Sequence, residues 1–140
     1  MRVYRLCHAD HQKLDGEGAR LYGGRWNKRG LTVIYTSMTL SLCVLEQLVH
    51  LDSDLIPTQT VAMTIDIPDH LSQEHLSEMP SQGCMTFGNQ WIQEKRSLSL
   101  VVPSAVIPVE KNVLINPLHS DFEKISILSV DPFQLDKRLV

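Results

Sequence analysis

The feature that most constrains the fold of this chain is one clear helical pattern set among short strand-like runs. Between residues 39 and 51, apolar residues recur every three or four positions and share one face of a helix: Leu42, Leu45, Leu48 and Val49. The hydroxyl of Ser37 or of Thr39 is suited to cap the first turn of this helix.

The other readable segments have the alternation and the β-branched residues of strands. They are residues 3–6, 32–36, 60–67, 98–102, 112–115 and 125–130, and a minor helix is expected over residues 89–95. Residues 9–24 are predicted to form a long loop, and residues 69–88 carry no clear pattern. Because strands and helices do not alternate regularly, the sequence predicts one strand-rich α+β domain over residues 1–140, with one principal helix.

Composition limits the classes of partner and the compartment. The three cysteines, Cys7, Cys43 and Cys84, are far apart and form no CxxC pair, so neither a disulfide framework nor a thiolate zinc site is expected, and the cytoplasm is the expected compartment. The HxxH spacing of His8 and His11 lacks accompanying carboxylates, so no metal site is predicted. The net charge of −3 and the lack of a long apolar run predict no direct nucleic-acid binding and no membrane span.

A glycine-rich loop carries the first functional signal. Gly23 and Gly24 permit close backbone approach, and the guanidinium of Arg25 offers a planar fork of donors suited to phosphate or carboxylate. With the indole of Trp26 beside it, such a loop fits a planar, anionic, nucleotide-like ligand. The alternative is an ordinary hairpin turn, with Trp26 in the core and Arg25 in solvent.

Two residues near the principal helix also have two interpretations. Glu46 lies at the edge of the apolar face, where a carboxylate either is held rigidly to stabilise positive charge or pairs with His50 four residues on. Tyr35 is expected either to stack against a ligand ring with its hydroxyl free, or to pack in the core. Asn112 and Asn116 are interpreted as residues that satisfy backbone groups at strand ends.

Taken together, these residues resemble the RES-domain family, the toxin component of bacterial Xre–RES toxin–antitoxin pairs. The resemblance spans nearly the whole chain. It rests on Gly-Gly-Arg-Trp-Asn at residues 23–27, Val-Ile-Tyr-Thr-Ser at 33–37, Leu-Glu at 45–46, Val-Pro-Ser-Ala-Val-Ile-Pro at 102–108 and Leu-Ile-Asn-Pro at 114–117.

The resemblance implies a fold similar to that of ADP-ribosyltransferase toxins and an enzyme whose substrate is NAD, with no separate cofactor. By motif position the arginine, glutamate and serine of the family name fall on Arg25, Glu46 and Ser104, and Ser37 competes for the serine. Tyr35 is the aromatic member of the same site. The expected catalytic residues are thus Arg25, Tyr35 and Glu46, and the expected substrate-binding residues are Gly24, Trp26, Asn27 and Ser104.

The implied chemistry suits these residue types. Cleavage of the nicotinamide–ribose bond creates an oxocarbenium-like centre, which Glu46 would stabilise, while Arg25 would hold the diphosphate and Tyr35 would pack on the nicotinamide or its ribose. Ser104 would hydrogen-bond a ribose hydroxyl or the carboxamide, or else cap a turn. The acceptor is water, giving an NAD glycohydrolase, or a specific host protein, giving an ADP-ribosyltransferase.

A non-catalytic nucleotide-binding module is the alternative from another class, and it would have no need for Glu46. The expected partner is a separately encoded, DNA-binding antitoxin of the Xre type, and the toxin is expected to be a homo-oligomer.

Overall fold

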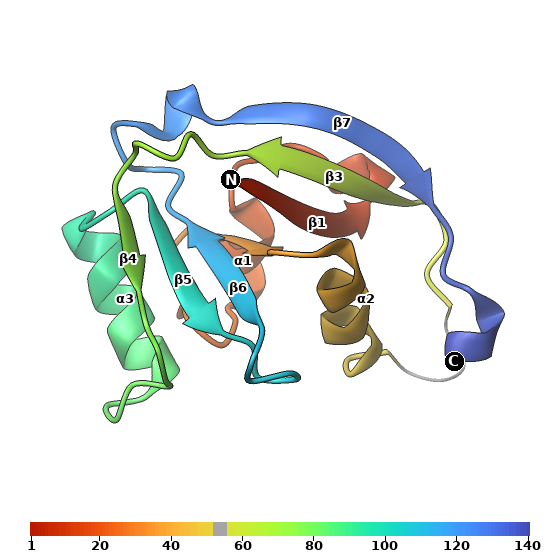
Figure 1. The fold of residues 1–140 in the computed structure, drawn as a ribbon, viewed down its shortest axis with the longest axis horizontal. Helices are drawn as coiled ribbons and strands as arrows, with labels where there is room; N and C mark the ends of the chain where they lie inside the picture. Colours follow the sequence, from red (N-terminus) through yellow and green to blue (C-terminus); the bar gives the residue numbers. More distant parts are fainter. Residues whose placement is uncertain (52–55) are drawn as a thin grey trace.

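In the computed structural model, which describes residues 1–51 and 56–140, the strands of the described residues form one seven-stranded sheet (Figure 1). In chain order the strands are β1 (Arg2–His8), β2 (Ile34–Ser37), β3 (Thr60–Asp66), β4 (Gln73–His75), β5 (Ser99–Pro103), β6 (Lys111–Ile115) and β7 (Ser126–Phe133). Their order across the sheet is β4-β5-β6-β2-β1-β3-β7, and neighbours are antiparallel except for the parallel pair β4–β5.

The sheet consists of two halves that meet at one point. β1 pairs with β3 along its whole length, but its pairing with β2 consists of Tyr4 opposite Ser37. Figure 1 shows the result: β4, β5 and β6 run down the page, whereas β1, β3 and β7 run across it. The two halves therefore diverge on either side of the Tyr4–Ser37 pair.

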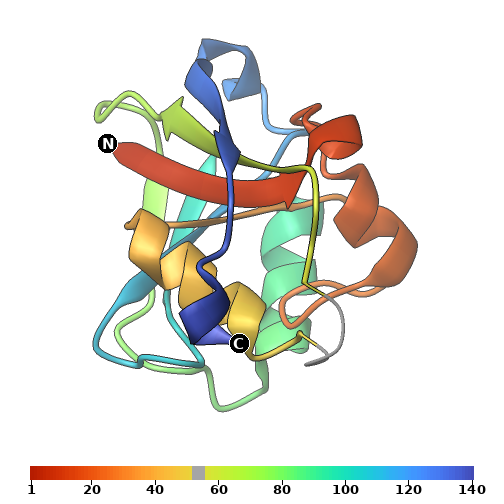
Figure 2. The same cartoon turned by 90° about the vertical axis from the view of Figure 1, so that its right-hand side faces the viewer.

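Three α-helices pack around this sheet in the described part of the chain: α1 (Glu17–Tyr22), α2 (Leu40–Leu48) and α3 (Cys84–Glu94). Three short 3-10 turns, η1 (Ala9–His11), η2 (Phe122–Lys124) and η3 (Lys137–Leu139), complete the described elements. Figures 1 and 2 both place α2 and α3 below β1 and β3. Thr39 is the N-cap of α2, because its hydroxyl oxygen accepts a hydrogen bond from the backbone N–H of Leu42 at 3.1 Å.

The buried apolar side chains form two core clusters. The first core cluster joins the two halves of the sheet, because Val3 and Met63 from β1 and β3 pack with Val101 and Val113 from β5 and β6. The second core cluster lies between α3 and the β5–β6 region and contains Trp26, Trp91, Ile92, Leu100 and Leu114. Apolar burial in the first cluster thus holds together two half-sheets that share little backbone pairing.

The structure differs from the predicted elements mainly around glycines. α3 begins at Cys84 rather than at residue 89, and α1 lies inside the predicted loop over residues 9–24. Gly88 weakens the helical pattern of α3, but a Cβ at this position would lie 1.9 Å from the carbonyl oxygen of Trp26. Close packing of α3 on that backbone therefore requires the residue that obscures the helix in the sequence.

Candidate active site

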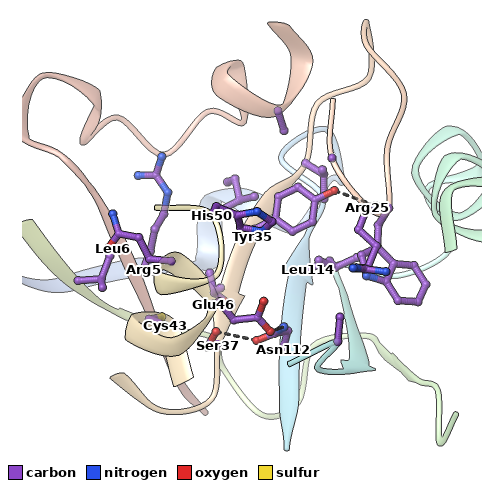
Figure 3. A pocket seen from close by; sticks show the side chains of 18 of the residues that line it. Arg5, Leu6, Arg25, Tyr35, Ser37, Cys43, Glu46, His50, Asn112 and Leu114 are labelled. Atoms are coloured by element: carbon purple, nitrogen blue, oxygen red, sulfur yellow. Dashed lines mark hydrogen bonds between the residues drawn. The ribbon is translucent and has the colours of Figure 1, made fainter. Parts of the chain in front are cut away.

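A cavity of about 800 Å³ opens where the two halves of the sheet diverge (Figure 3). Its walls come from β1, β2, β6, α2 and the loop after α1. Tyr35 and Ser37 of β2 lie opposite Leu114 and Asn112 of β6, so the pleat places all four on one face of the sheet. Arg5 of β1, Glu46 of α2 and Arg25 also line the cavity.

The carboxylate of Glu46 is held through one of its two oxygens. Oε1 accepts a hydrogen bond from the Ser104 hydroxyl at 2.6 Å and another from Nδ2 of Asn112 at 2.7 Å. No described residue donates to Oε2, and the carboxylate faces the cavity in Figure 3. The predicted pair with His50 is not formed among the described residues, although His50 does line the cavity.

Ser104 has one of the two roles expected of it, the cap of a turn, and it also bonds Glu46. Its hydroxyl oxygen accepts hydrogen bonds from the backbone N–H groups of Val106 and Ile107, each at 3.0 Å, so it caps the turn after β5. Its proton is directed to Glu46. Because the side chain is fully buried, Ser104 orients the carboxylate from behind and does not reach the cavity as the predicted substrate contact.

The glycine-rich loop forms a tight turn, as expected from the alternative of a hairpin turn. Gly24 and Asn27 pair across the turn, with N···O distances of 3.0 and 3.4 Å, and Arg25 and Trp26 occupy its tip. Arg25 is exposed, lines the cavity and has no hydrogen bond or ion pair with any described residue. The turn therefore presents a guanidinium whose donors are available to a ligand.

Gly24 serves the packing of Tyr35 in addition to lining the cavity. A Cβ at Gly24 would lie 2.6 Å from the Tyr35 hydroxyl, so another residue type would displace the ring. That hydroxyl donates to Oδ1 of Asn27 at 2.6 Å and accepts from the backbone N–H of Trp26 at 3.0 Å. The expectation of a free hydroxyl is therefore wrong, and what Tyr35 offers a ligand is its ring. Burial raises the pKa of Tyr35 to about 12.

Two predicted substrate contacts are buried in the core, although Trp26 also lines the cavity. Asn27 is 0% exposed, and its Nδ2 donates to three backbone carbonyls, those of Ala19, Lys28 and Leu31. Trp26 is 3% exposed and packs edge to face against Phe87 in the second core cluster. Both predictions followed from position in the Gly-Gly-Arg-Trp-Asn motif, but in a tight turn successive side chains point in different directions.

Two residues at the cavity were missed. Asn112, interpreted as a partner of backbone groups, bonds Glu46 and Ser37 instead, whereas Asn116 does bond backbone groups, those of Ile92 and Leu118. Arg5 lines the cavity from β1 and donates to the carbonyl oxygen of His11 at 3.2 Å. Arg5 lies two residues after the buried Val3 and therefore on the same face of β1, and a cation on the inward face of a strand is the signal that could have identified it.

Cys43 also lines the cavity but is not set up as a nucleophile. Its Sγ donates to the carbonyl oxygen of Tyr4 at 3.0 Å, and burial raises the pKa of the thiol. Within residues 1–51 and 56–140, no three His, Cys, Asp or Glu side chains converge as metal ligands would. No helix in the same ranges has the length and apolarity needed to cross a membrane.

A second cavity, of about 690 Å³, adjoins the first. The two share Gly23, Gly24, Arg25 and His50, and the second continues to Cys84 and Met85 at the start of α3. Arg25 therefore lies at the boundary between the two cavities.

Comparisons with known proteins give a consistent family. A family model described as RES domain matches residues 2–136. "Toxin Res" of Photorhabdus laumondii is 38% identical over 152 residues, which cover 100% of this chain and 97% of the relative. "Prs ADP-ribosylating toxin" of a Sphingobium species is 33% identical over 141 residues, which cover 91% of this chain and 86% of the relative. In fold, the chain is similar to a chain of the M. tuberculosis MbcT–MbcA toxin–antitoxin complex, with a TM-score of 0.72, 20% identity, and coverage of 99% of this chain and 85% of the other.

Proposed function

The chain belongs to the RES domain family, and from this premise we propose that it is the NAD-consuming toxin of a toxin–antitoxin pair. The reaction is cleavage of the bond between nicotinamide and ribose, with water as the acceptor. The observation that carries the proposal is the carboxylate of Glu46, which two donors fix through Oε1 while Oε2 faces the cavity. A rigid carboxylate with one oxygen available suits the stabilisation of a cationic ribose centre.

The arginines and the two cavities suit a dinucleotide. NAD consists of two nucleosides joined by a diphosphate, and Arg25 lies where the two cavities meet. A diphosphate at this boundary would receive the guanidinium of Arg25, while the nucleosides would extend to either side. Arg5 adds a second positive charge on the β1 wall. The ring of Tyr35 provides a face on which the nicotinamide or its ribose packs.

Leaving-group chemistry explains why one carboxylate is enough. Oxidised nicotinamide carries a positive charge on its ring nitrogen and departs as a neutral molecule, so no acid is needed to protonate it. The bond that breaks joins this nitrogen to the ribose carbon, and a water oxygen then bonds the same carbon and loses a proton to solvent. Between bond cleavage and the attack of water, the negative charge of Glu46 stabilises the positive charge on the ribose.

The test is incubation of the purified protein with NAD, following nicotinamide release without any other protein present. Nicotinamide and ADP-ribose in equal amounts are the expected products. A folded protein that binds NAD but leaves it intact would support the nucleotide-binding module in place of the enzyme.

A second candidate is transfer of ADP-ribose to a host protein, favoured by the relative from Sphingobium that is named as an ADP-ribosylating toxin. Both reactions need the same Glu46 and the same bond cleavage. They differ in acceptor, so labelled NAD incubated with cell extract distinguishes them: label that becomes attached to one protein band supports transfer, and free ADP-ribose supports hydrolysis.

The proposal includes an antitoxin that restrains the enzyme in the cytoplasm. Relatives are named toxins, and the structural neighbour comes from a toxin–antitoxin complex. A DNA-binding antitoxin of the Xre type would exclude NAD by covering the cavity, and self-association of the toxin would give it a composite surface to bind. Co-expression should restore growth to cells that the toxin alone arrests, and the two proteins should co-purify.

A further inference from the structure

The side-chain amide of Asn112 lies between Glu46 and Ser37 and is hydrogen-bonded at both ends. Nδ2 lies 2.7 Å from Oε1 of Glu46, and Oδ1 lies 2.6 Å from Oγ of Ser37. An ionised carboxylate only accepts hydrogen bonds, so the NH₂ group must face Glu46. A reversed amide would place two oxygens against each other. With this orientation set by Glu46, the Ser37 hydroxyl donates to Oδ1 and holds the other end of the amide.

The second donor to Glu46 is fixed in a different way. Two backbone N–H groups, of Val106 and Ile107, occupy the lone pairs of the Ser104 oxygen, so its only proton is directed to Oε1 of Glu46. Ser104 is thus held by the turn after β5, whereas Asn112 is held by a side chain on the neighbouring strand β2. Two independent supports converge on one oxygen.

We propose that Asn112 is a positioning residue for NAD cleavage, and that Ser37 acts through it. Asn112 and Ser104 together stop rotation of the Glu46 carboxylate about its last bond, which leaves Oε2 as the oxygen presented to the ribose. Ser37 restrains the other end of the Asn112 amide. The role of Asn112 rests on the proposed function of the cavity.

This arrangement predicts a particular pattern of kinetic losses. Without Asn112, Ser104 alone holds the carboxylate, so Asn112→Ala should lower kcat about 10- to 100-fold while KM changes less than about threefold. Ser37→Ala leaves the amide in place but without its second partner, so kcat should fall only a few-fold. The double variant should be no slower than Asn112→Ala alone, because Ser37 has no other route to Glu46.

The matched control is Asn116→Ala. Asn116 is a fully buried asparagine, whereas Asn112 is half-buried; Asn116 bonds two backbone groups and does not line the cavity. Its replacement should lower thermal stability but leave kcat per folded molecule unchanged. The inference would be overturned if the losses in kcat of Ser37→Ala and Asn112→Ala multiply in the double variant. It would also be overturned if KM rises while kcat stays unchanged.

A readout without turnover separates this inference from the proposed function. In NMR spectra of protein made by cell-free synthesis, the side-chain NH₂ signals of Asn112 should move in both Ser37→Ala and Glu46→Gln and stay in place in Asn116→Ala. If the wild type is inactive but the Asn112 signals move in the two variants, the proposed function is overturned, whereas the hydrogen bond from Asn112 to Glu46 is supported. Active wild type with signals that do not move would overturn the role of Asn112 alone.

Discussion

Replacement of Glu46 by glutamine removes one negative charge from the cavity while it keeps the hydrogen bonds that the carboxylate accepts. Ser104 and Asn112 both donate to Oε1, so the amide oxygen of the new side chain must take that position. Its NH₂ group then replaces Oε2 and faces the cavity. Glu46→Gln therefore turns an anionic acceptor into a neutral donor at a single, known position.

The size of the effect follows from the charge that is lost. A unit charge ~4 Å from a developing positive centre stabilises it by about 4 kcal/mol at an effective dielectric constant of about 20. Since about 1.4 kcal/mol corresponds to a factor of ten in rate, kcat should fall about 100- to 1000-fold. Each retained hydrogen bond weakens by about 1 kcal/mol because its acceptor is now neutral, partly offset by the absence of a charge to desolvate. The melting temperature should therefore change by only a few degrees.

The assay compares nicotinamide release by wild type, Glu46→Gln and Glu123→Gln, with NAD affinity measured by calorimetry. Glu123 is an exposed glutamate of η2 away from the cavity, so its replacement removes the same charge without touching the site. The control should match wild type, and Glu46→Gln should bind NAD normally but turn it over slowly. Near-normal turnover by Glu46→Gln, or a loss of NAD binding as large as the loss of rate, would refute the electrostatic reasoning.

Three further substitutions test separate parts of the structure. Arg25→Lys keeps a charge but loses the bidentate fork, so NAD affinity should fall about tenfold by calorimetry; wild-type affinity in both Arg25→Lys and Arg25→Ala would rule out the phosphate contact. Gly88→Ala places a Cβ 1.9 Å from the carbonyl oxygen of Trp26 and should cost about 3 kcal/mol of unfolding free energy in urea; an unchanged midpoint would contradict the close packing of α3. Tyr35→Phe leaves the N–H of Trp26 and Oδ1 of Asn27 without their partner, which should cost about 2–4 kcal/mol in the same assay. Because burial raises the pKa of Tyr35 to about 12, its contribution to stability should be complete below pH ~10 and lost as the pH rises from ~10 to ~12, and a similar loss in Tyr35→Phe would show that another group is responsible.

The elements that could be predicted are those whose signal is local. Thr39 before an apolar stripe identifies α2, and alternation identifies the longer strands. α1 could not be predicted, because it is a six-residue helix that contains Gly18 and is flanked by Gly16 and Gly23 at positive φ. β4 is a three-residue strand that exists through its parallel pairing with β5, which no local pattern reveals.

The same distinction applies to the site. Glu46 and Ser104 could be located from motifs, and the structure brings them within 2.6 Å. Asn112 could not be assigned to the site, because its role depends on β6 lying beside β2, which places it against Ser37, 75 positions earlier in the chain. Arg5 likewise reaches the cavity only because β1 diverges from β2.

The single residue pair at which β1 meets β2 predicts how the protein responds to cold. The two half-sheets adhere through the apolar contacts of the first core cluster, and such adhesion weakens on cooling. The cavity spans the same seam, with Arg5 on one side and Asn112 on the other. Low temperature should therefore weaken the binding of any molecule that contacts both walls before it breaks the hydrogen bonds between strands within either half. The affinity for such a ligand should then be more sensitive to cold than the stability of the fold.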